Sequence, residues 1–291
     1  MACIKRRPQI GLIVKNFSAG YGIQKKNDSH AVVRNVSFSL DIGTLTALIG
    51  ANGCGKSTLL KGLCKLIPSS GNVLFNHSLP QNALGHQKAT DTHFAETILN
   101  LHQLSTRQLA RLISYIPQRS GITVSLSVLD VVMMGFHPYL RLLESPGKAH
   151  HERAMDALET VGLASKKEQD FLTLSEGQKQ LCILARTLVQ DTRLLLLDEP
   201  DSALDFSNRH LLLQTVQKII YTGQKTGLLV LHDINLALDY CDQLLLMKDG
   251  EIIRTLYPKI DSEKTLSEAL SEICGNVKVF RKDGHCLMYR I

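Results

Sequence analysis

The chain has 291 residues but no tryptophan, and aromatic residues make up only 5% of it. It also has no apolar run near the roughly 20 residues that a membrane-spanning helix needs. Its longest apolar runs, at 194–197 and 228–231, have the length of strands. We therefore expect a soluble protein that acts at a membrane only through a partner.

The start of the chain faintly resembles a signal peptide, because the basic residues 5–7 precede the apolar stretch 10–14. That stretch is shorter than the apolar region of a signal peptide. The alternation that follows it favours a first strand instead.

Paired cysteines are also lacking. The seven cysteines are an odd, scattered set without a CxxC pair. Such a set indicates neither a disulfide framework nor a zinc site, so a reducing cytoplasm fits best.

The charge balance is only moderately basic. A formal net charge of +6 is spread along the sequence, and 44% hydrophobic with 21% charged residues is ordinary for a soluble globular chain. An acidic membrane surface or a nucleic acid attracts such a charge, but a solvated surface is the better interpretation. We expect no nucleic-acid partner.

Strand and helix patterns predict an α/β fold. Residues 10–48 are strand-like, and the buried strand 44–49 runs into a glycine-rich loop and a helix at 57–66. Later elements follow in alternation: strands at 194–197, 227–231 and 243–248, with helices at 206–220 and 234–240. This order indicates a parallel sheet covered by helices.

Three further segments are distinct in pattern. Residues 76–106 are rich in polar residues and are interpreted as an insertion, and the pattern from 106 to 167 is helical. The tail 255–291 has the pattern of a small α/β appendage.

The glycine-rich loop at 50–57, GANGCGKS, matches GxxxxGK[ST] in full between a strand and a helix. Its glycines let backbone N–H groups turn toward phosphates, which the start of the following helix also attracts. Lys56 is expected to reach the β- and γ-phosphates, and the Ser57 hydroxyl to ligate Mg²⁺. The nucleotide-binding residues expected here are Gly50, Asn52, Gly53, Cys54, Gly55, Lys56, Ser57 and Thr58.

Two carboxylates end the strand at 194–197. Asp198 is expected to hold Mg²⁺, directly or through water, and Glu199 to polarise the attacking water. Such a pair alone equally fits a helix cap, but together with the phosphate loop it indicates ATP hydrolysis.

With the segment LSEGQ at 174–178, these motifs resemble the ABC ATPase family over nearly the whole chain. The segment is similar to the LSGGQ signature, which other P-loop ATPases lack. The resemblance implies a P-loop NTPase fold: a RecA-like core with a mainly parallel sheet, an antiparallel β portion and a helical subdomain that carries the signature. It implies one domain, 1–291, with the core at 10–105 and 171–254, the helical subdomain at 106–170 and the appendage at 255–291.

The resemblance also implies single-residue roles. Tyr21 matches the aromatic that stacks on adenine, Gln118 the glutamine that senses Mg²⁺ and couples to the permease, 202–205 the loop that crosses the dimer interface, and His232 the switch histidine near the γ-phosphate. The implied catalytic residues are thus Glu199, His232, Lys56 and Gln118, and the implied metal-binding residues are Ser57, Gln118 and Asp198.

A head-to-tail dimer follows from the same resemblance. ATP with Mg²⁺ is expected between the loop of one copy and the signature residues Ser175, Gly177 and Gln178 of the other. The expected partners are a second copy, an integral-membrane permease and a substrate-binding protein, at the cytoplasmic face of the cell membrane.

The sequence departs from the family pattern in three places. Glu176 replaces a glycine of the signature and either weakens closure of the dimer or faces solvent, and Asp201 stands where Thr or Ser is common. The 76–106 insertion contains four irregularly spaced histidines, for which a solvated loop is favoured over a metal site: His77, His86, His93 and His102.

Cys54 lies inside the phosphate loop beside Lys56 and before a helix start. We expect this position to favour the thiolate, so that maleimides inhibit the ATPase and ATP protects it.

The segments at 107–118 and 128–140, RQLARLISYIPQ and VLDVVMMGFHPYL, resemble the ATPases of iron–siderophore, haem and cobalamin importers. In that group, the segment after the glutamine forms part of the groove for the permease's coupling helix. A molybdate importer, a soluble ABC ATPase without a permease and a nucleotide-binding regulator without turnover remain alternatives.

Overall fold

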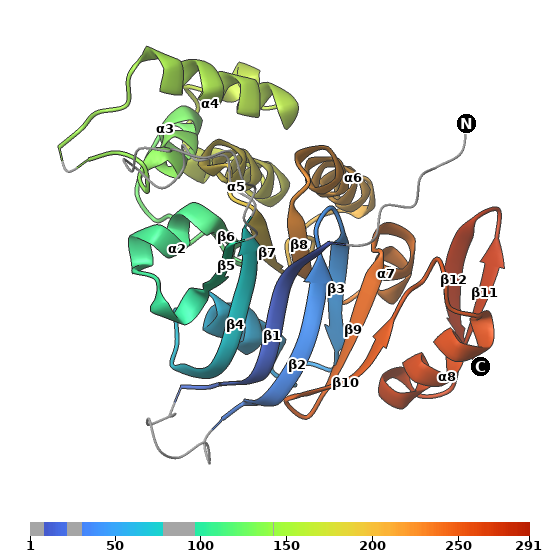
Figure 1. The fold of residues 1–291 in the computed structure, drawn as a ribbon. Coiled ribbons are helices and arrows are strands. Elements are labelled where there is room, and N and C mark those ends of the chain that lie inside the picture. The colour runs from blue at the N-terminus through green and yellow to red at the C-terminus, as the bar shows by residue number, and fades with distance from the viewer. Residues whose placement is uncertain (1–8, 22–30, 78–96, 142) are drawn as a thin grey trace, which may run out of the picture.

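The computed structural model describes residues 9–21, 31–77, 97–141 and 143–291 (Figure 1). The basic start of the chain, Cys3, His86 and His93 lie outside the described residues. In the described ranges, no helix combines the length and the apolar character that a membrane span requires.

Four strands between residues 10 and 100 form an antiparallel sheet in the order β2-β1-β4-β5. Its strands are β1 (Ile10–Ala19), β2 (Val33–Asp41), β4 (Ser69–His77) and β5 (Thr97–Asn100). Alternation buries Val36, Phe38 and Leu40 on one face of β2. The expected antiparallel portion is confirmed.

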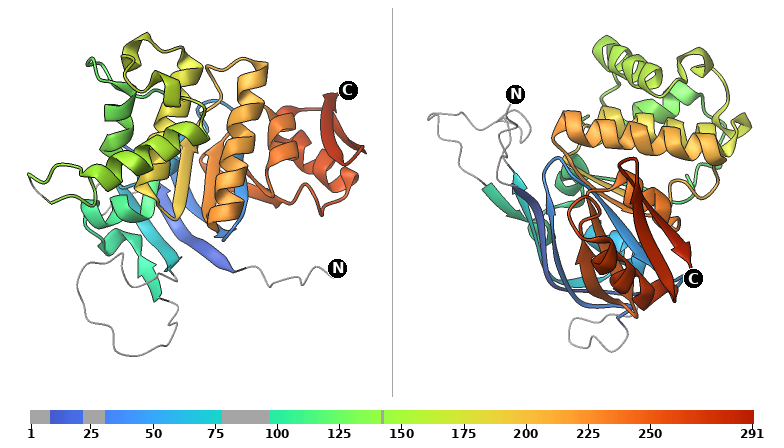
Figure 2. Two further views of the ribbon diagram at one scale, coloured as in Figure 1. Left: turned by 90° about the horizontal axis from the view of Figure 1, so that it is seen from above. Right: turned by 90° about the vertical axis from the view of Figure 1, so that its right-hand side faces the viewer.

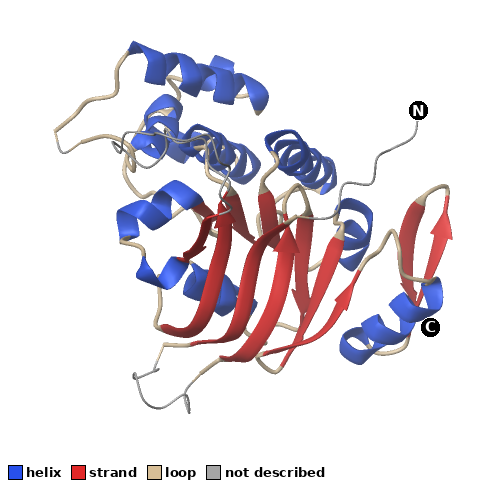
Figure 3. Cartoon of the chain, in the orientation of Figure 1, coloured by secondary structure: helices blue, strands red, loops and turns tan. Residues whose placement is uncertain are grey.

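The second sheet has six strands in the order β10-β9-β3-β8-β7-β6. They are β3 (Leu45–Gly50), β6 (Ile113–Ile116), β7 (Leu194–Asp198), β8 (Thr226–Val230), β9 (Gln243–Lys248) and β10 (Glu251–Leu256). All neighbours from β9 to β6 are parallel, and β10 is antiparallel to β9. Figure 3 shows the two sheets in red with helices around them. Every residue of β7 and β8 is buried, as their apolar runs predict.

The parallel order positions the site. Gly50, Ile116, Asp198 and Val230 are the last residues of four parallel strands, β3, β6, β7 and β8. Because carboxyl ends of parallel strands meet at one edge of the sheet, the loops that follow these strands lie close together.

Helices cover this sheet and extend beyond it. Helix α1 (Lys56–Leu63) follows β3, α6 (Phe206–Gly223) follows β7, and α7 (Ile234–Tyr240) follows β8. Helices α3 (Val128–Met133), α4 (Lys148–Thr160) and α5 (Glu176–Gln190) pack together in a helical part of the molecule (Figures 1 and 2). Three short 3₁₀ segments belong to this part: η4 (Met134–Phe136), η5 (Ala164–Lys166) and η6 (Phe171–Thr173).

Two segments differ from the sequence-based expectation. Helix α2 (Thr106–Leu112) is followed by strand β6, so 106–167 is not helical throughout. The apolar residues Ile113 and Ile116 let this strand join β7 in the buried sheet. The described end of the expected insertion forms β5 and the 3₁₀ helix η3 (Leu101–Gln103), whose Leu101 is buried, so this end is not a solvated loop.

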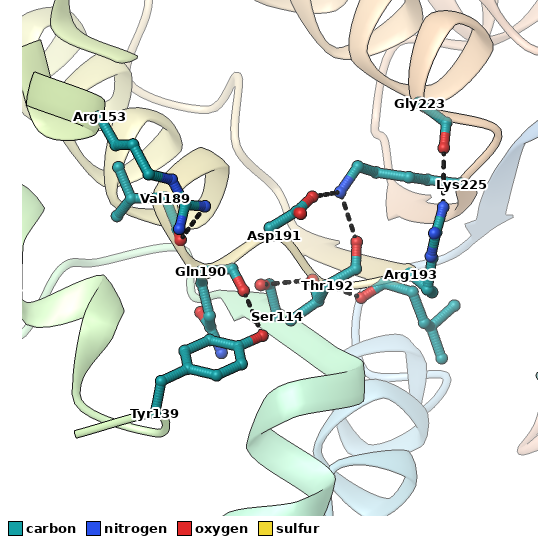
Figure 4. A network of polar contacts seen from close by, with 11 residues as sticks. Ser114, Tyr139, Arg153, Val189, Gln190, Asp191, Thr192, Arg193, Gly223 and Lys225 are labelled. Atoms are coloured by element: carbon teal, nitrogen blue, oxygen red, sulfur yellow. Dashed lines mark hydrogen bonds and ion pairs between the residues drawn. The ribbon is translucent and has the colours of Figure 1, made fainter. Parts of the chain in front are cut away.

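A polar network joins the end of α5 to the core (Figure 4). Asp191, with φ of 50°, ends the helix. The Tyr139 hydroxyl donates to the carbonyl of Gln190 at 2.7 Å, and Lys225 Nζ donates to Asp191 Oδ1 at 2.8 Å and to the carbonyl of Thr192 at 2.7 Å. The last carbonyls of a helix have no partner inside it, so Tyr139 satisfies one from outside. The network holds the C-terminal end of α5, which is the end farther from the signature.

The tail contains α8 (Glu263–Cys274) and a hairpin of β11 (Val277–Lys282) and β12 (His285–Arg290). Side chains cover both edges of the hairpin. Ser267 Oγ accepts from the N–H of Val279 at 2.8 Å, and Asn235 of α7 bonds the N–H and C=O of Met288 at 2.7 and 3.3 Å. The appendage is therefore closed to strand addition at these positions.

Candidate nucleotide site

The phosphate loop joins β3 to α1. Gly53 and Gly55 have φ of 80° and 111°, which side chains disfavour, and a Cβ at Gly50 would lie 2.2 Å from the carbonyl oxygen of Met247. Lys56 is buried, and its Nζ donates to the carbonyls of Gly50 and Ala51 at 2.8 and 3.0 Å. The ammonium is thus folded back over the loop, where it can meet a phosphate group.

A second group joins α1 to the end of β7. The Ser57 hydroxyl donates to Asp198 Oδ1 at 2.7 Å, and the Tyr115 hydroxyl donates to Asp198 Oδ2 at 3.0 Å. Asp198 is buried. A hydroxyl and a carboxylate are hard oxygen donors, so Ser57 and Asp198 fit a Mg²⁺ ion that also binds phosphate oxygens.

Glu199 connects the ends of three strands. Its φ of 50° is unusual for a residue with a side chain. Gln118 Nε2, beyond β6, donates to Glu199 Oε2 at 2.6 Å, and His232 Nε2, beyond β8, lies 2.6 Å from Glu199 Oε1. Each carboxylate oxygen therefore has its own partner, which restricts rotation of the carboxylate.

The glutamine loop is also tied to α5. Gln180 is buried, and its Nε2 donates to the backbone carbonyl of Gln118 at 3.0 Å. Because α5 begins at the signature and Gln180 lies in its second turn, this bond links the signature end of the helix to the loop that carries the partner of Glu199.

The signature lies at the start of α5. Ser175 is the N-cap: its hydroxyl accepts from the N–H of Gln178 at 3.3 Å, and the Gln178 side chain accepts from the N–H of Ser175 at 3.2 Å. A Cβ on Gly177 would lie 3.1 Å from Leu204 of the 202–205 loop. Glu176 is exposed and pairs with Lys179 at 2.7 Å, so its charge is directed along its own helix.

The remaining predicted residues are spread around this edge. Tyr21, two residues beyond β1, is 66% exposed, and Thr58 is buried in α1. Asp205 caps α6 by accepting from the N–H of Asn208 at 2.9 Å. Asp201 is buried, and burial raises the pKa of its carboxyl above the ordinary value.

The prediction that the position of Cys54 favours the thiolate is wrong. Burial raises the pKa of the Cys54 thiol, and this effect outweighs the lowering by Lys56. Cys54 is buried, with 9% of its residue surface exposed, so desolvation of the anion dominates.

Sequence reasoning missed Tyr115 and Gln180 as members of this site. Tyr115 required the register of β6: it pairs with Leu196 of β7, and its side chain therefore faces the same side as Asp198, two positions on. Gln180 needed the packing of α5 against the glutamine loop, which its helical position alone does not reveal.

The sheet order, the phosphate loop and the two carboxylates define a P-loop ATPase. The chain matches the family model for ABC transporters over residues 33–202. It is 31% identical to a petrobactin import ATP-binding protein of Bacillus anthracis over 263 residues, which cover 90% of this chain and 85% of that protein. It is 35% identical to a hemin import ATP-binding protein of Bordetella bronchiseptica over 230 residues, or 76% and 79% of the two chains. The chain belongs to the ABC transporter family, as an ATP-binding cassette.

Solved structures share the fold. An ABC transporter described as of metal-chelate type, in an inward-facing conformation, gives a TM-score of 0.72 at 24% identity and covers 97% of this chain and 96% of that one. The dimeric ATP-binding cassette MJ0796, in a post-hydrolysis state with ADP and Pi, gives a TM-score of 0.67 at 23% identity, with 85% and 98% covered.

Proposed function

We propose that this ABC ATPase powers import of a metal chelate of the iron–siderophore, haem or cobalamin type through a membrane permease. The support is the set of import ATP-binding proteins among its relatives, which include petrobactin and hemin importers. The permease would hold the subunit at the cytoplasmic face of the membrane, and a substrate-binding protein would deliver the chelate. Substrate choice would rest with those other subunits.

The observation that carries hydrolysis is the clamped carboxylate of Glu199. Gln118 and His232 hold its two oxygens at 2.6 Å each. A carboxylate fixed in this way can accept a proton from a water molecule and orient it toward the γ-phosphate. His232 and Lys56 would hold the charge that develops during transfer.

Nucleotide binding would use the loop residues around Lys56, with Tyr21 against the adenine. Ser57, Asp198 and, through its side chain, Gln118 would hold Mg²⁺, which would supply positive charge beside the phosphates. Asp198 already faces Ser57 at 2.7 Å, so little reorganisation of these two groups is needed.

A second copy would complete the site. The α5 start, with the Ser175 hydroxyl, Gly177 and Gln178, presents backbone N–H groups that favour an anion. In a head-to-tail dimer these groups would meet the γ-phosphate held by the loop of the other copy. Closure and reopening of the dimer would then drive the permease between its two access states.

The test is Glu199→Gln, which keeps the shape of the side chain but removes the base. We expect turnover to fall by about 100-fold or more, with nucleotide binding retained. Glu272→Gln, which breaks only an exposed ion pair with Arg254, is the control and should leave turnover unchanged. Equal turnover in the two variants would contradict the proposed role of Glu199.

A further inference from the structure

Asp198 uses both carboxylate oxygens for side-chain contacts. Oδ1 accepts from Ser57 at 2.7 Å, and Oδ2 accepts from the Tyr115 hydroxyl at 3.0 Å. Ser57 belongs to the phosphate loop, but Tyr115 comes from the edge strand β6, which the phosphate-binding motif does not include.

The fold places the Tyr115 hydroxyl with little freedom. Tyr115 pairs with Leu196 in the register of β6 and β7, and its half-buried ring packs against the core cluster that contains Leu196. A phenol hydroxyl donates its proton, and the carboxylate of Asp198 accepts it at 3.0 Å.

We propose that Tyr115 is a positioning residue that holds the Asp198 carboxylate in the orientation that binds the divalent cation of the nucleotide complex. This inference rests on the cation site in the proposed function. With Oδ2 anchored to Tyr115, Oδ1 stays directed at Ser57. Without the hydroxyl, Ser57 is the remaining side chain bonded to the carboxylate among the described residues, and the carboxylate is freer to rotate.

The test measures binding of Mn²⁺ in the presence of ADP by electron paramagnetic resonance, so it does not depend on turnover. Tyr115→Phe keeps the ring and removes the hydroxyl. We expect the Kd for Mn²⁺ to rise by about 3- to 10-fold, the range for loss of one hydrogen bond. Affinity for ADP without metal should stay within about twofold, because Tyr115 contacts the carboxylate.

Tyr221→Phe is the matched control. Its hydroxyl also donates to a carboxylate, Asp242, at 2.9 Å, but Asp242 directly precedes β9 and so lies at the amino ends of the parallel strands, away from the site. It should leave Mn²⁺ affinity unchanged. Equal loss in both variants, or equal loss of metal-free ADP binding in Tyr115→Phe, would assign the effect to general destabilisation and overturn the proposal.

The Asp198→Asn variant distinguishes a failure of the proposed cation site from a failure of the positioning role of Tyr115. If Tyr115 acts through Asp198, then Tyr115→Phe should add little further loss in the Asp198→Asn background. If Asp198→Asn weakens Mn²⁺ binding while Tyr115→Phe does not, the inference about Tyr115 fails and the cation site stands. If wild-type protein with ADP binds no Mn²⁺, the proposed cation site and the inference both fail.

Discussion

His232 Nε2 lies 2.6 Å from Glu199 Oε1, although the two residues are 33 positions apart and follow different strands. Glu199 directly follows β7, and His232 follows β8 by two residues. Parallel pairing of β7 with β8 brings them together. The contact therefore depends on sheet register, and a shift of either strand would break it.

The His232–Glu199 contact predicts a loss of turnover without a loss of binding. In His232→Ala, Glu199 keeps Gln118 as a partner but loses the group on Oε1. We expect the kcat for ATP hydrolysis to fall by about 100-fold, with the Kd for ATP changed by less than about threefold. His210→Ala, which removes a histidine bonded to Tyr240 at 2.8 Å, is the control. A parallel fall in both variants would argue against a role for His232 in catalysis.

Gln180 should support hydrolysis from outside the reacting groups. Gln180→Met keeps a side chain of similar length but removes the donor to the Gln118 carbonyl. The Gln118 side chain then holds Glu199 less firmly, and we expect kcat to fall about fivefold, in line with loss of one hydrogen bond.

The matched control for Gln180 is Gln217→Met. Gln217 lies on helix α6, and its Nε2 also donates to a backbone carbonyl, the carbonyl of Tyr240, at 2.9 Å. This variant should keep the kcat of wild type. A loss of ATP affinity in Gln180→Met, with kcat unchanged, would contradict the proposed link to Glu199.

Cys54 should react with maleimide slowly at neutral pH. Because burial raises its pKa, the thiolate fraction is small at pH 7 and increases as the pH rises toward and beyond 9. We expect the labelling rate to increase about tenfold per pH unit below that pKa, as read by mass spectrometry of the Cys54 peptide. ATP should slow labelling, and Cys54→Ala should abolish inhibition. Fast, pH-independent labelling between pH 6 and 8 would show a lowered pKa instead.

The network at the end of α5 should contribute to stability. In Lys225→Met, the buried cation that joins Asp191 to the Thr192 carbonyl is lost. We expect the free energy of unfolding to fall by about 1–3 kcal/mol. Lys264→Met removes an exposed pair with Glu268 at 3.9 Å and should change it by less than about 0.5 kcal/mol. Denaturant titration measures the free energy of unfolding of both variants. An equal decrease in the two would contradict a stabilising role for the network.

Much of the core could be predicted from the sequence. The apolar run at 194–197 and the loop at 50–57 have few structural alternatives, because a buried parallel strand and a phosphate loop each demand particular residue types. The helix Ile234–Tyr240 and the strand Gln243–Lys248 were predicted with their observed bounds.

Other features depend on packing that no local pattern records. Strand β6 has four residues beside a helix, and only its pairing with β7 makes it a strand. The pKa of Cys54 follows from burial by the surrounding chain rather than from its neighbour Lys56. Glu176 and Lys179 are three positions apart on α5, a spacing that allows an ion pair. Whether the pair forms depends on the rotamers of the two side chains, which the sequence does not determine.

The most direct test of the central claim uses the Glu199→Gln protein, tagged and expressed in its own host. Membranes are solubilised with ATP present, the tagged protein is captured, and its partners are identified by mass spectrometry. The account predicts stoichiometric recovery of a multi-helix permease with the tagged protein. Recovery of the tagged protein from the soluble fraction alone, with soluble partners, would contradict the importer function and leave a soluble ABC ATPase.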